Sequence, residues 1–258
     1  MIGQLKDIIL PDNKKIYFAS DFHLGAPTSE SSLVREKKVV EWLKSIKDDA
    51  YHIFLLGDIF DFWFEYKYTI PKGFTRLQGA VIALRDEGIP ITIFTGNHDM
   101  WMFHYFQDEF GIPVYRNPAN VTINDKKFLI GHGDGLGPGD RRYKLIKKVF
   151  ENPFSQWMFK WLHPDIAFNI AKGLSKRSRI KNLVKDEEFK GDDEWLYQYC
   201  KEMEKQVHHD YYIFGHRHLP FIVDINDNSQ YMNLGDWIFS YTYGEFNNNE
   251  MHLKRFID

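Results

Sequence analysis

The sequence is poor in cysteine and has no long apolar run, and both absences limit what the protein can be. Of its 258 residues one is a cysteine, Cys200, so no internal disulfide can form. No window approaches the roughly 20 apolar residues that a membrane-spanning helix needs. The first residues, MIGQLKDIILPDNKK, lack the uninterrupted apolar stretch of a signal peptide. These absences predict a cytosolic protein and leave a position on a membrane surface open.

Acidic residues are scarce in one segment. Residues 141–185 contain two acids, Glu151 and Asp165, beside twelve lysines and arginines. This segment therefore carries a formal charge of +10, which leaves −13 on the rest of a chain whose net charge is −3. A basic segment on an acidic body is informative about partners rather than about the fold.

Apolar runs alternate with helical patterns through the first 130 residues. Alternation of this kind predicts an α/β fold with a layered core. The predicted elements are strands over 15–20, 51–56 and 89–95, helices over 30–47, 74–87 and 101–110, and a hairpin over 121–130.

The pattern changes at residue 140. Residues 140–210 are helical in pattern, and we expect a helical insertion there, between the core segments 1–139 and 211–258. Within it, five apolar residues share one helix face, namely Phe154, Trp157, Met158, Trp161 and Leu162. The last part of the chain predicts a second, antiparallel-rich sheet, with strands over 221–225, 230–234, 237–243 and 251–256.

Five short motifs each follow an apolar run, and each contains aspartate, asparagine or histidine. In chain order they are SDFHLG (20–25), GDIFD (57–61), TGNHDM (95–100), IGHGDG (130–135) and FGHRH (214–218). Open α/β sheets place their ligand sites at the carboxyl ends of strands. We therefore expect one site assembled from the whole length of the chain, with Asp58 at its centre.

The polar residues of these motifs are typical metal ligands. They are Asp21, His23, Asp58, Asn97, His132, His216 and His218. A mixture of carboxylate, imidazole and amide oxygen suits manganese, iron or zinc better than calcium or magnesium. Seven ligands are too many for one ion and suit two ions about 3.5–4 Å apart that share a carboxylate. Cleavage of a phosphoester or a pyrophosphate is the chemistry that such a pair serves.

One histidine or one Gly-Asp pair would carry little weight. A lone histidine is more often structural than a metal ligand, and Gly-Asp is an ordinary turn. Here the order D-x-H, G-D-x-x-D, G-N-H-D, G-H-G-D, G-H-x-H is complete, and each element lies at a predicted strand end. The metal-site interpretation is therefore preferred.

This ordered set resembles the calcineurin-like metallophosphoesterase superfamily over residues 1–140 and 211–258. The resemblance implies a four-layer α/β/β/α sandwich with a helical insertion, or cap. It implies a dinuclear site in which Asp58 bridges the two ions. One ion would be held by Asp21, His23, Asp58 and His218, and the other by Asp58, Asn97, His132 and His216. It also implies that His98 stabilises the transition state or protonates the leaving oxygen, and that Asp61 orients His98.

Within the superfamily, the chain resembles the UDP-2,3-diacylglucosamine pyrophosphatase family of lipid A biosynthesis. The resemblance rests on SDFHLG, GDIFDFWFEY and HGDGLGPGDRRYK. It implies a metal-dependent hydrolase that uses water to produce UMP and 2,3-diacylglucosamine 1-phosphate. It implies two divalent ions, with manganese expected and iron or zinc as alternatives.

The same resemblance implies a cytoplasmic protein that works peripherally at the inner membrane, in contact with an anionic membrane surface. The chain departs from the main branch of that family at one position, because His98 stands where the main branch has arginine. Gly-Asn-His-Asp is the pattern of the wider superfamily and of a divergent branch.

The basic aromatic insertion is expected to bind the nucleotide-linked glycolipid. Its apolar face can line a chamber for acyl chains, and its lysines and arginines can hold a pyrophosphate. In the simpler interpretation, the aromatic face packs against the core and the charges are solvated. The candidate substrate contacts are Asp140, Tyr143, Ser175, Arg177 and Arg179.

Three alternatives remain open. A phosphoesterase for a soluble phosphomonoester, phosphodiester or nucleotide would have its insertion packed closed, with no apolar chamber beside the metals. A nuclease would bind nucleic-acid phosphates through the basic segment, but no nucleic-acid-binding motif is recognisable, so no nucleic-acid partner is expected. A non-catalytic scaffold would have been free to lose the ligand set, which is intact here.

Overall fold

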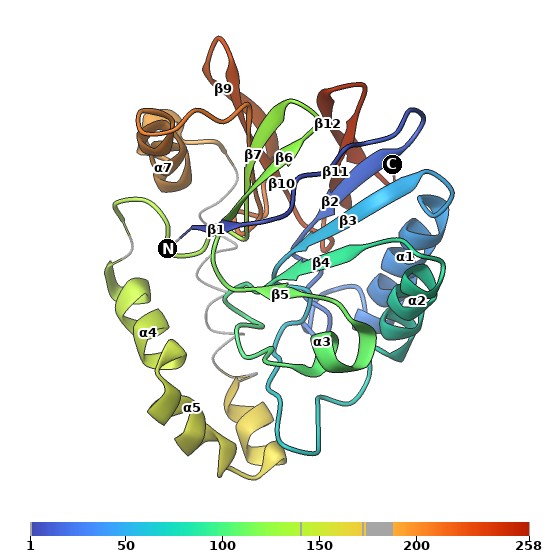
Figure 1. Cartoon of the computed structure of the whole chain (residues 1–258). Coiled ribbons are helices and arrows are strands. Elements are labelled where there is room, and N and C mark those ends of the chain that lie inside the picture. Colours follow the sequence, from blue (N-terminus) through green and yellow to red (C-terminus); the bar gives the residue numbers. More distant parts are fainter. Residues whose placement is uncertain (1, 140, 172, 174–187, 258) are drawn as a thin grey trace.

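The computed structural model describes residues 2–139, 141–171, 173 and 188–257. Across these residues the strands form two six-stranded sheets (Figure 1). Sheet A has the strand order β1-β6-β7-β8-β10-β9, and sheet B has the order β12-β11-β2-β3-β4-β5. Strands β2, β3 and β4 run parallel in sheet B, and β7 and β8 run parallel in sheet A.

The strands agree closely with the apolar runs of the first 130 residues. In sheet A they are β1 (Gly3–Gln4), β6 (Ala119–Ile123), β7 (Lys126–Ile130), β8 (Tyr211–Phe214), β9 (Pro220–Asn226) and β10 (Ser229–Leu234). In sheet B they are β2 (Lys15–Ala19), β3 (Ala50–Leu56), β4 (Ile91–Phe94), β5 (Val114–Tyr115), β11 (Thr242–Asn247) and β12 (Glu250–Arg255).

Alternating side chains hold the two sheets together. Successive residues of a strand point to opposite faces, so Phe18 of β2 faces sheet A while Tyr17 faces outward. The ring of Phe18 stacks on Phe54 of sheet B at 5.2 Å and on Phe128 of sheet A at 6.1 Å between centroids. The core between the sheets is therefore dry and aromatic.

Helices cover both outer faces of the paired sheets. The helices α1 (Ser32–Ser45), α2 (Thr75–Asp86) and α3 (Tyr105–Phe110) pack on sheet B. On sheet A, α7 (Trp195–Glu204) follows the short 3-10 helix η1 (Gly191–Asp193) and packs Leu196 and Cys200 against Tyr212. The order is helix, sheet, sheet, helix, which confirms the predicted four-layer sandwich.

Two further helices lie apart from the sandwich. Figure 1 shows α4 (Arg141–Glu151) and α5 (Pro153–Lys160) extending away from both sheets, and a helix over residues 164–171 follows. By contrast, α7 belongs to the same predicted insertion but packs on sheet A. The division into core and insertion stays a prediction. None of the helices in the described ranges has the length and apolar character that crossing a bilayer requires.

The prediction of a separate C-terminal sheet is wrong. Strand β10 pairs with β8 and so extends sheet A, whereas β11 pairs with β2 and extends sheet B. The strand predicted over 237–243 is also wrong in its start, because β11 begins at Thr242. The Asp236 carboxylate accepts hydrogen bonds from the backbone N–H groups of Phe239 and Ser240, which turns the chain from one sheet to the other.

Candidate metal centre

The five motifs follow five strands, and their polar side chains meet at one edge of the sandwich. Asp21 and His23 follow β2, Asp58 follows β3, Asn97 and His98 follow β4, His132 follows β7, and His216 and His218 follow β8. Parallel strands deliver their carboxyl ends to the same edge. Residues almost 200 positions apart in the sequence thus become neighbours.

One cluster consists of Asp21, His23, Asp58 and His218, whose side-chain ligand atoms all lie within 4.8 Å of one another. The Nε2 atoms of His23 and His218 are 3.1 Å apart. An Asp21 oxygen lies 3.3 Å from His218 Nε2, and an Asp58 oxygen lies 3.6 Å from His23 Nε2. These atoms surround a space of the size that one cation fills.

A second group of polar atoms adjoins the first through Asp58. Asp58 Oδ2 lies 3.4 Å from His132 Nε2, which is 3.2 Å from the amide oxygen of Asn97. The ring of His216 lies 5.1 Å from that of His132. One carboxylate oxygen therefore faces both groups, which is the position that a bridging ligand requires.

The donor atoms fit divalent metal ions. Ligand atoms bound to one ion at about 2.1 Å lie about 3.0–3.4 Å from each other, and the neighbouring ligand atoms given above lie 3.1–3.6 Å apart, close to this spacing. Asp21 Oδ1 and His216 Nδ1 are buried and have no hydrogen-bond partner among the described residues. His132 Nδ1 lies 2.8 Å from the carbonyl oxygen of Leu56. In the neutral, metal-binding form of His132, that contact would keep the proton on Nδ1 and leave the Nε2 lone pair available to an ion.

The backbone of the ligand loops is strained where the side chains converge. Five of the seven predicted ligands have positive φ angles between 44° and 69°, namely Asp21, His23, Asp58, His216 and His218. Such conformations cost roughly 1–3 kcal/mol each in non-glycine residues. Gly96 and Gly215 permit the close packing, because a β-carbon would lie 2.1 Å from Asp58 Oδ1 at the first and 2.3 Å from Asp21 Oδ2 at the second.

Arg35 holds the first strained loop, and our sequence reasoning missed it. This fully buried side chain of α1 donates to the carbonyl oxygens of Phe22 at 2.8 Å and His23 at 2.7 Å, and to the hydroxyl of Thr28 at 2.8 Å. The only sequence signal is its place four residues before Val39 on the buried face of the helix. Arg35 thereby fixes the backbone that presents Asp21 and His23.

Replacement of Arg35 by methionine is expected to lower the free energy of unfolding by about 3 kcal/mol, because removing one partner from a buried charged network strands the others. Urea unfolding measures this change. Lys37→Met, at an exposed position of the same helix, is the matched control and should change stability by less than about 0.5 kcal/mol. Equal stability of the two variants would contradict the assigned role.

His98 lies beside the first cluster with Asp61 behind it. His98 Nδ1 is 3.0 Å from the Asp61 carbonyl oxygen and 3.4 Å from its carboxylate. The ring of His98 stands edge-on to that of His23, at 4.8 Å between centroids. Burial alone would lower the pKa of His98, but Asp58 and Asp61 outweigh it and raise that pKa to about 9. The two carboxylates therefore favour the protonated form of His98.

Asp58 is the electrostatic centre. Burial alone would raise its pKa, but His132 and His98 outweigh burial and hold the pKa of Asp58 well below its usual range. The same interaction opposes the effect of burial on His132, so that the pKa of His132 rises to about 10. A carboxylate that stays ionised among imidazoles is the charge that a cation site needs.

Two further buried carboxylates shape the site, and sequence reasoning assigned them no role. Asp99 accepts hydrogen bonds from the backbone N–H groups of Ile59, Phe60 and Gly96, which ties the loop after β3 to the loop after β4. An Asp236 oxygen lies 3.4 Å from His218 Nδ1. Asp99 stands in a motif and could have been found from it, whereas Asp236 carried no signal beyond Gly-Asp.

The structure describes one of the five predicted substrate contacts, Tyr143. Asp140, Ser175, Arg177 and Arg179 lie outside the described residues. Tyr143 is described, and its hydroxyl donates to Asp134 Oδ2 at 2.5 Å.

Two cavities lie between the core and the helices α4 and α5. The smaller, about 320 Å³, adjoins the third motif at Gly96 and is lined also by Trp101, Arg116 and Lys147. The larger, about 700 Å³, has walls of mixed character: charged residues line it, namely Glu65, Lys67, Asp108, Glu109 and Lys160, together with the aromatic residues Phe64, Tyr66, Tyr68, Phe103, Tyr105 and Trp157. Phe103 and Gln156 line both cavities, so the two adjoin.

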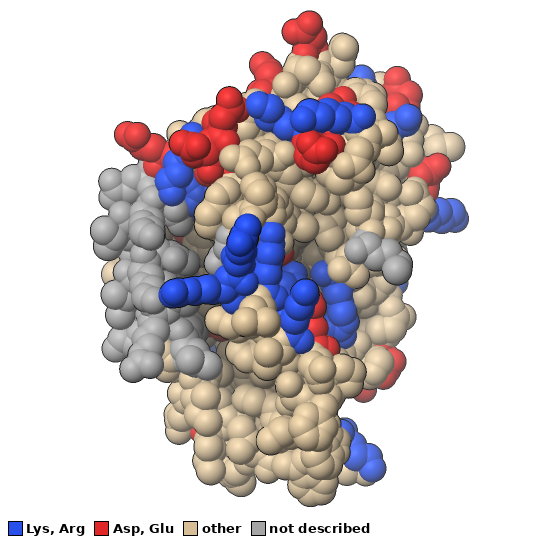
Figure 2. Space-filling model, turned by 90° about the vertical axis from the view of Figure 1, so that its left-hand side faces the viewer, with Lys and Arg blue, Asp and Glu red and all other residues tan. Residues whose placement is uncertain are grey.

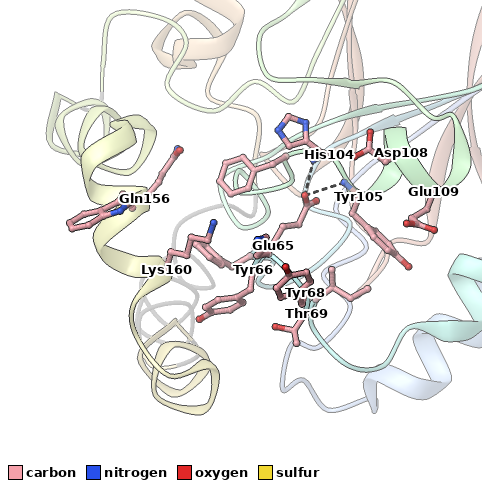
Figure 3. Close-up of a pocket in the computed structure, with 15 residues that line it drawn as sticks. Glu65, Tyr66, Tyr68, Thr69, His104, Tyr105, Asp108, Glu109, Gln156 and Lys160 are labelled. Atoms are coloured by element: carbon pink, nitrogen blue, oxygen red, sulfur yellow. Dashed lines mark hydrogen bonds between the residues drawn. The ribbon is translucent and has the colours of Figure 1, made fainter.

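The larger cavity lies between α5 and α3 (Figure 3). Glu65 lines this cavity and accepts hydrogen bonds from the backbone N–H groups of His104 and Tyr105, at 2.7 and 3.1 Å (Figure 3). Lys160 and Gln156 reach in from α5 on the opposite wall (Figure 3). The helix α5 therefore forms one wall of a chamber, and its Phe159 also packs against Phe64 and Trp101 of the core, at 4.8 and 4.6 Å between ring centroids.

Comparison with known proteins agrees with this geometry. The family "Calcineurin-like phosphoesterase" matches residues 14–220. The "UDP-2,3-diacylglucosamine hydrolase" of Porphyromonas gingivalis is 35% identical over 95% of this chain and 98% of its own length. The protein of that name from Proteus mirabilis is 31% identical over 76% of this chain and 82% of its own. A dimetal phosphatase structure from Danio rerio aligns over 95% of this chain and 96% of its own, with 11% identity and a TM-score of 0.47.

Proposed function

Because this chain belongs to the calcineurin-like phosphoesterase family, we propose that it hydrolyses the pyrophosphate of UDP-2,3-diacylglucosamine to UMP and 2,3-diacylglucosamine 1-phosphate. The observation that carries the proposal is the Porphyromonas gingivalis hydrolase, which is 35% identical and aligns over nearly the full length of both chains. The site geometry supports the same reaction class.

The seven predicted ligands act as two groups in this proposal. Asp21, His23 and His218 hold one divalent ion, and Asn97, His132 and His216 hold the other, with Asp58 between them. Divalent ions at these places supply Lewis-acid activation of the phosphoryl group and of the attacking water. Manganese is the proposed ion, because mixed imidazole, carboxylate and amide donors favour such metals over calcium and magnesium.

His98 is proposed as the proton donor to the leaving oxygen, or as the group that stabilises charge on it. In the reaction, an oxygen of water bonds to phosphorus and gives up a proton to the solvent, the bridging P–O bond breaks, and the departing oxygen takes up a proton from His98 or leaves as an anion that the positive charge of His98 stabilises. His98 is suited to this role because it stands beside the ligand cluster and Asp61 fixes its ring through Nδ1. In this proposal its Nε2 faces the substrate in the bound complex.

The two adjoining cavities support a lipid-linked substrate. The smaller one starts at Gly96, next to the ligand Asn97, and contains the cations of Arg116 and Lys147. The larger one continues away from the metal centre between walls that include aromatic residues. We propose that the anionic part of the substrate lies in the first and that an acyl chain extends into the second. The insertion would then bind substrate, in the part that α4 and α5 form.

The direct test is release of UMP from UDP-2,3-diacylglucosamine with manganese present, followed by chromatography of the nucleotide and mass spectrometry of the lipid product. The expected result is equal amounts of UMP and 2,3-diacylglucosamine 1-phosphate. Turnover of bis(p-nitrophenyl) phosphate without any UMP release would favour a soluble phosphoester as substrate. No activity on either compound, with no metal bound, would favour a scaffold.

We also propose that the protein works at the cytoplasmic face of the inner membrane. Phe154 and Trp161, at the two ends of α5, are 65% and 76% exposed. Figure 2 shows lysine and arginine side chains gathered in the middle of the face that carries α4 and α5, above a surface that is largely uncharged. Exposed aromatic residues beside cations suit the boundary of an anionic bilayer.

The double variant Phe154→Ser/Trp161→Ser is expected to bind phosphatidylglycerol vesicles at least about tenfold more weakly than the wild type, since each large apolar side chain contributes about 1.5–3 kcal/mol when buried. Vesicle sedimentation measures this. Ile9→Ser, at an exposed apolar residue outside the insertion, is the control. Unchanged vesicle binding by the double variant would show that this surface does not contact the membrane.

A further inference from the structure

Asp134 connects the metal centre to the helical insertion. It lies two residues after the predicted ligand His132 and is buried, with 6% of its surface exposed. Its Oδ2 atom accepts hydrogen bonds from the Tyr143 hydroxyl at 2.5 Å and from Lys147 Nζ at 2.7 Å. Both donors belong to α4, one helical turn apart. A single carboxylate of the fourth motif thus holds two residues of one helix.

Neighbouring contacts strengthen this junction. Lys147 also donates to the Asp134 carbonyl oxygen at 3.2 Å, and Lys144 donates to the carbonyl oxygen of Gly137. The ring of Tyr143 lies 6.4 Å from that of His216, a second predicted ligand. The first turns of α4 are therefore fastened to the loop after β7, and the helix lies directly beside the metal centre.

The far end of α4 is fastened to a different motif. Trp101, which follows the third motif, donates from its indole N–H to the carbonyl oxygen of Phe150 at 2.9 Å. Together the two junctions place α4 across the smaller cavity, which Asp134, Lys147 and Gly96 all line. The position of α4 relative to the ligands therefore sets the shape of the space that the substrate would enter.

We propose that Asp134 is a positioning residue that fastens α4 to the His132 loop through Tyr143 and Lys147, and so aligns the lipid-sugar part of the substrate with the metal centre. Asp134 need not touch the substrate. The inference rests on the proposed function for its substrate, but the junction itself can be tested without any substrate. It also gives Tyr143 a structural partner in place of the direct substrate contact predicted from the sequence.

The first test is hydrogen–deuterium exchange of the full-length protein, compared between the wild type and Lys147→Met. In the variant, the amide exchange rate over residues 141–151 should be at least about tenfold higher, because the helix loses its contact with the Asp134 carboxylate. The exchange rates in the two sheets should stay unchanged. Lys147→Arg, which keeps the cation, should restore protection. Lys148→Met, at the adjacent exposed residue, is the matched control. Unchanged exchange in Lys147→Met would overturn the proposal, whatever the substrate.

The second test separates positioning from metal binding. Lys147→Met and Asp134→Asn should each raise KM for UDP-2,3-diacylglucosamine at least about tenfold, while the manganese bound per chain changes less than about twofold. A rise in KM for Lys147→Met alone would overturn the proposal and assign Lys147 to the substrate directly. Loss of bound manganese in either variant would also overturn it, because the residue would then act through the predicted ligand His132. Absence of wild-type turnover of the glycolipid would refute the proposed function, while the exchange experiment still decides the junction.

Discussion

Asp58→Ala is expected to abolish hydrolysis, with activity reduced by at least about 10³-fold, since the loss of even one electrostatic contact to a transition state costs about 10²–10³. Asp58 is the one carboxylate whose Oδ2 faces both His23, at 3.6 Å, and His132, at 3.4 Å. Without it the two predicted metal positions have no shared anion between them. Steady-state rates with manganese, together with bound metal by mass spectrometry, measure the effect.

Asp227→Ala, in an exposed turn, is the matched control for the Asp58 variant. It should keep the wild-type rate and metal content. Circular dichroism should show that both variants are folded, so that lost activity reports on the site. Near-normal hydrolysis by Asp58→Ala would overturn the assignment of the bridge.

His98→Ala is expected to lower kcat by about 10²–10⁴-fold, the range typical of a lost general acid. It should keep both metal positions, because His98 is not one of the seven predicted ligands. His98 does form a second cluster with His23 and Asp61, whose ligand atoms also lie within 4.8 Å of one another, so bound metal has to be measured. Rates and bound manganese measured on the same preparation separate the two effects. Loss of the ions together with the rate would make His98 a ligand rather than a proton donor.

Asp61→Asn is expected to lower kcat less than His98→Ala does. The Asp61 carboxylate lies 3.4 Å from His98 Nδ1, while the Asp61 carbonyl oxygen, at 3.0 Å, survives the substitution. The loss should therefore be smaller than that of His98→Ala, about 10–100-fold, as for other groups that orient a functional side chain. A larger loss than that of His98→Ala would indicate a separate role for Asp61.

The sequence was sufficient to predict the family and the central strands, and to predict that the five motifs follow strands. The family resemblance is confirmed by the match over residues 14–220, and each of the five motifs does follow a strand. The reason is physical: short apolar runs that end in Gly-Asp, Gly-Asn or Gly-His combine a buried strand with a turn that only certain residues accept. The ligand roles themselves stay predictions.

The C-terminal strands could not be assigned to their sheets from sequence alone. Alternating patterns identify strands but not their neighbours, and both sheets had an edge available for another strand. The choice depends on the turn at Asp236, whose carboxylate binds two backbone N–H groups just downstream. Gly235-Asp236 is typical of an ordinary turn, so the sequence did not predict that the chain crosses from sheet A to sheet B there.

The buried charged residues that hold the loops around the site could not be predicted from the sequence either. The buried face of α1 includes Arg35 and Glu36, which a hydrophobic pattern assigns to solvent. Arg35 binds carbonyl oxygens of the first motif loop, and Glu36 accepts hydrogen bonds from the N–H groups of Arg76 and Leu77 at the start of α2. These carbonyl and N–H partners are backbone groups, which every residue carries, so only the folded chain reveals the contacts.

The measurement that tests the account most directly is the number of manganese ions per chain and its relation to UMP release. Protein stripped with a chelator is reloaded stepwise, and bound metal and rate are measured at each step. We expect two ions per wild-type chain, and hydrolysis that rises as the second ion binds. We also expect that Asp58→Ala fails to hold the pair. One ion per chain with full activity would contradict a dinuclear centre bridged by Asp58.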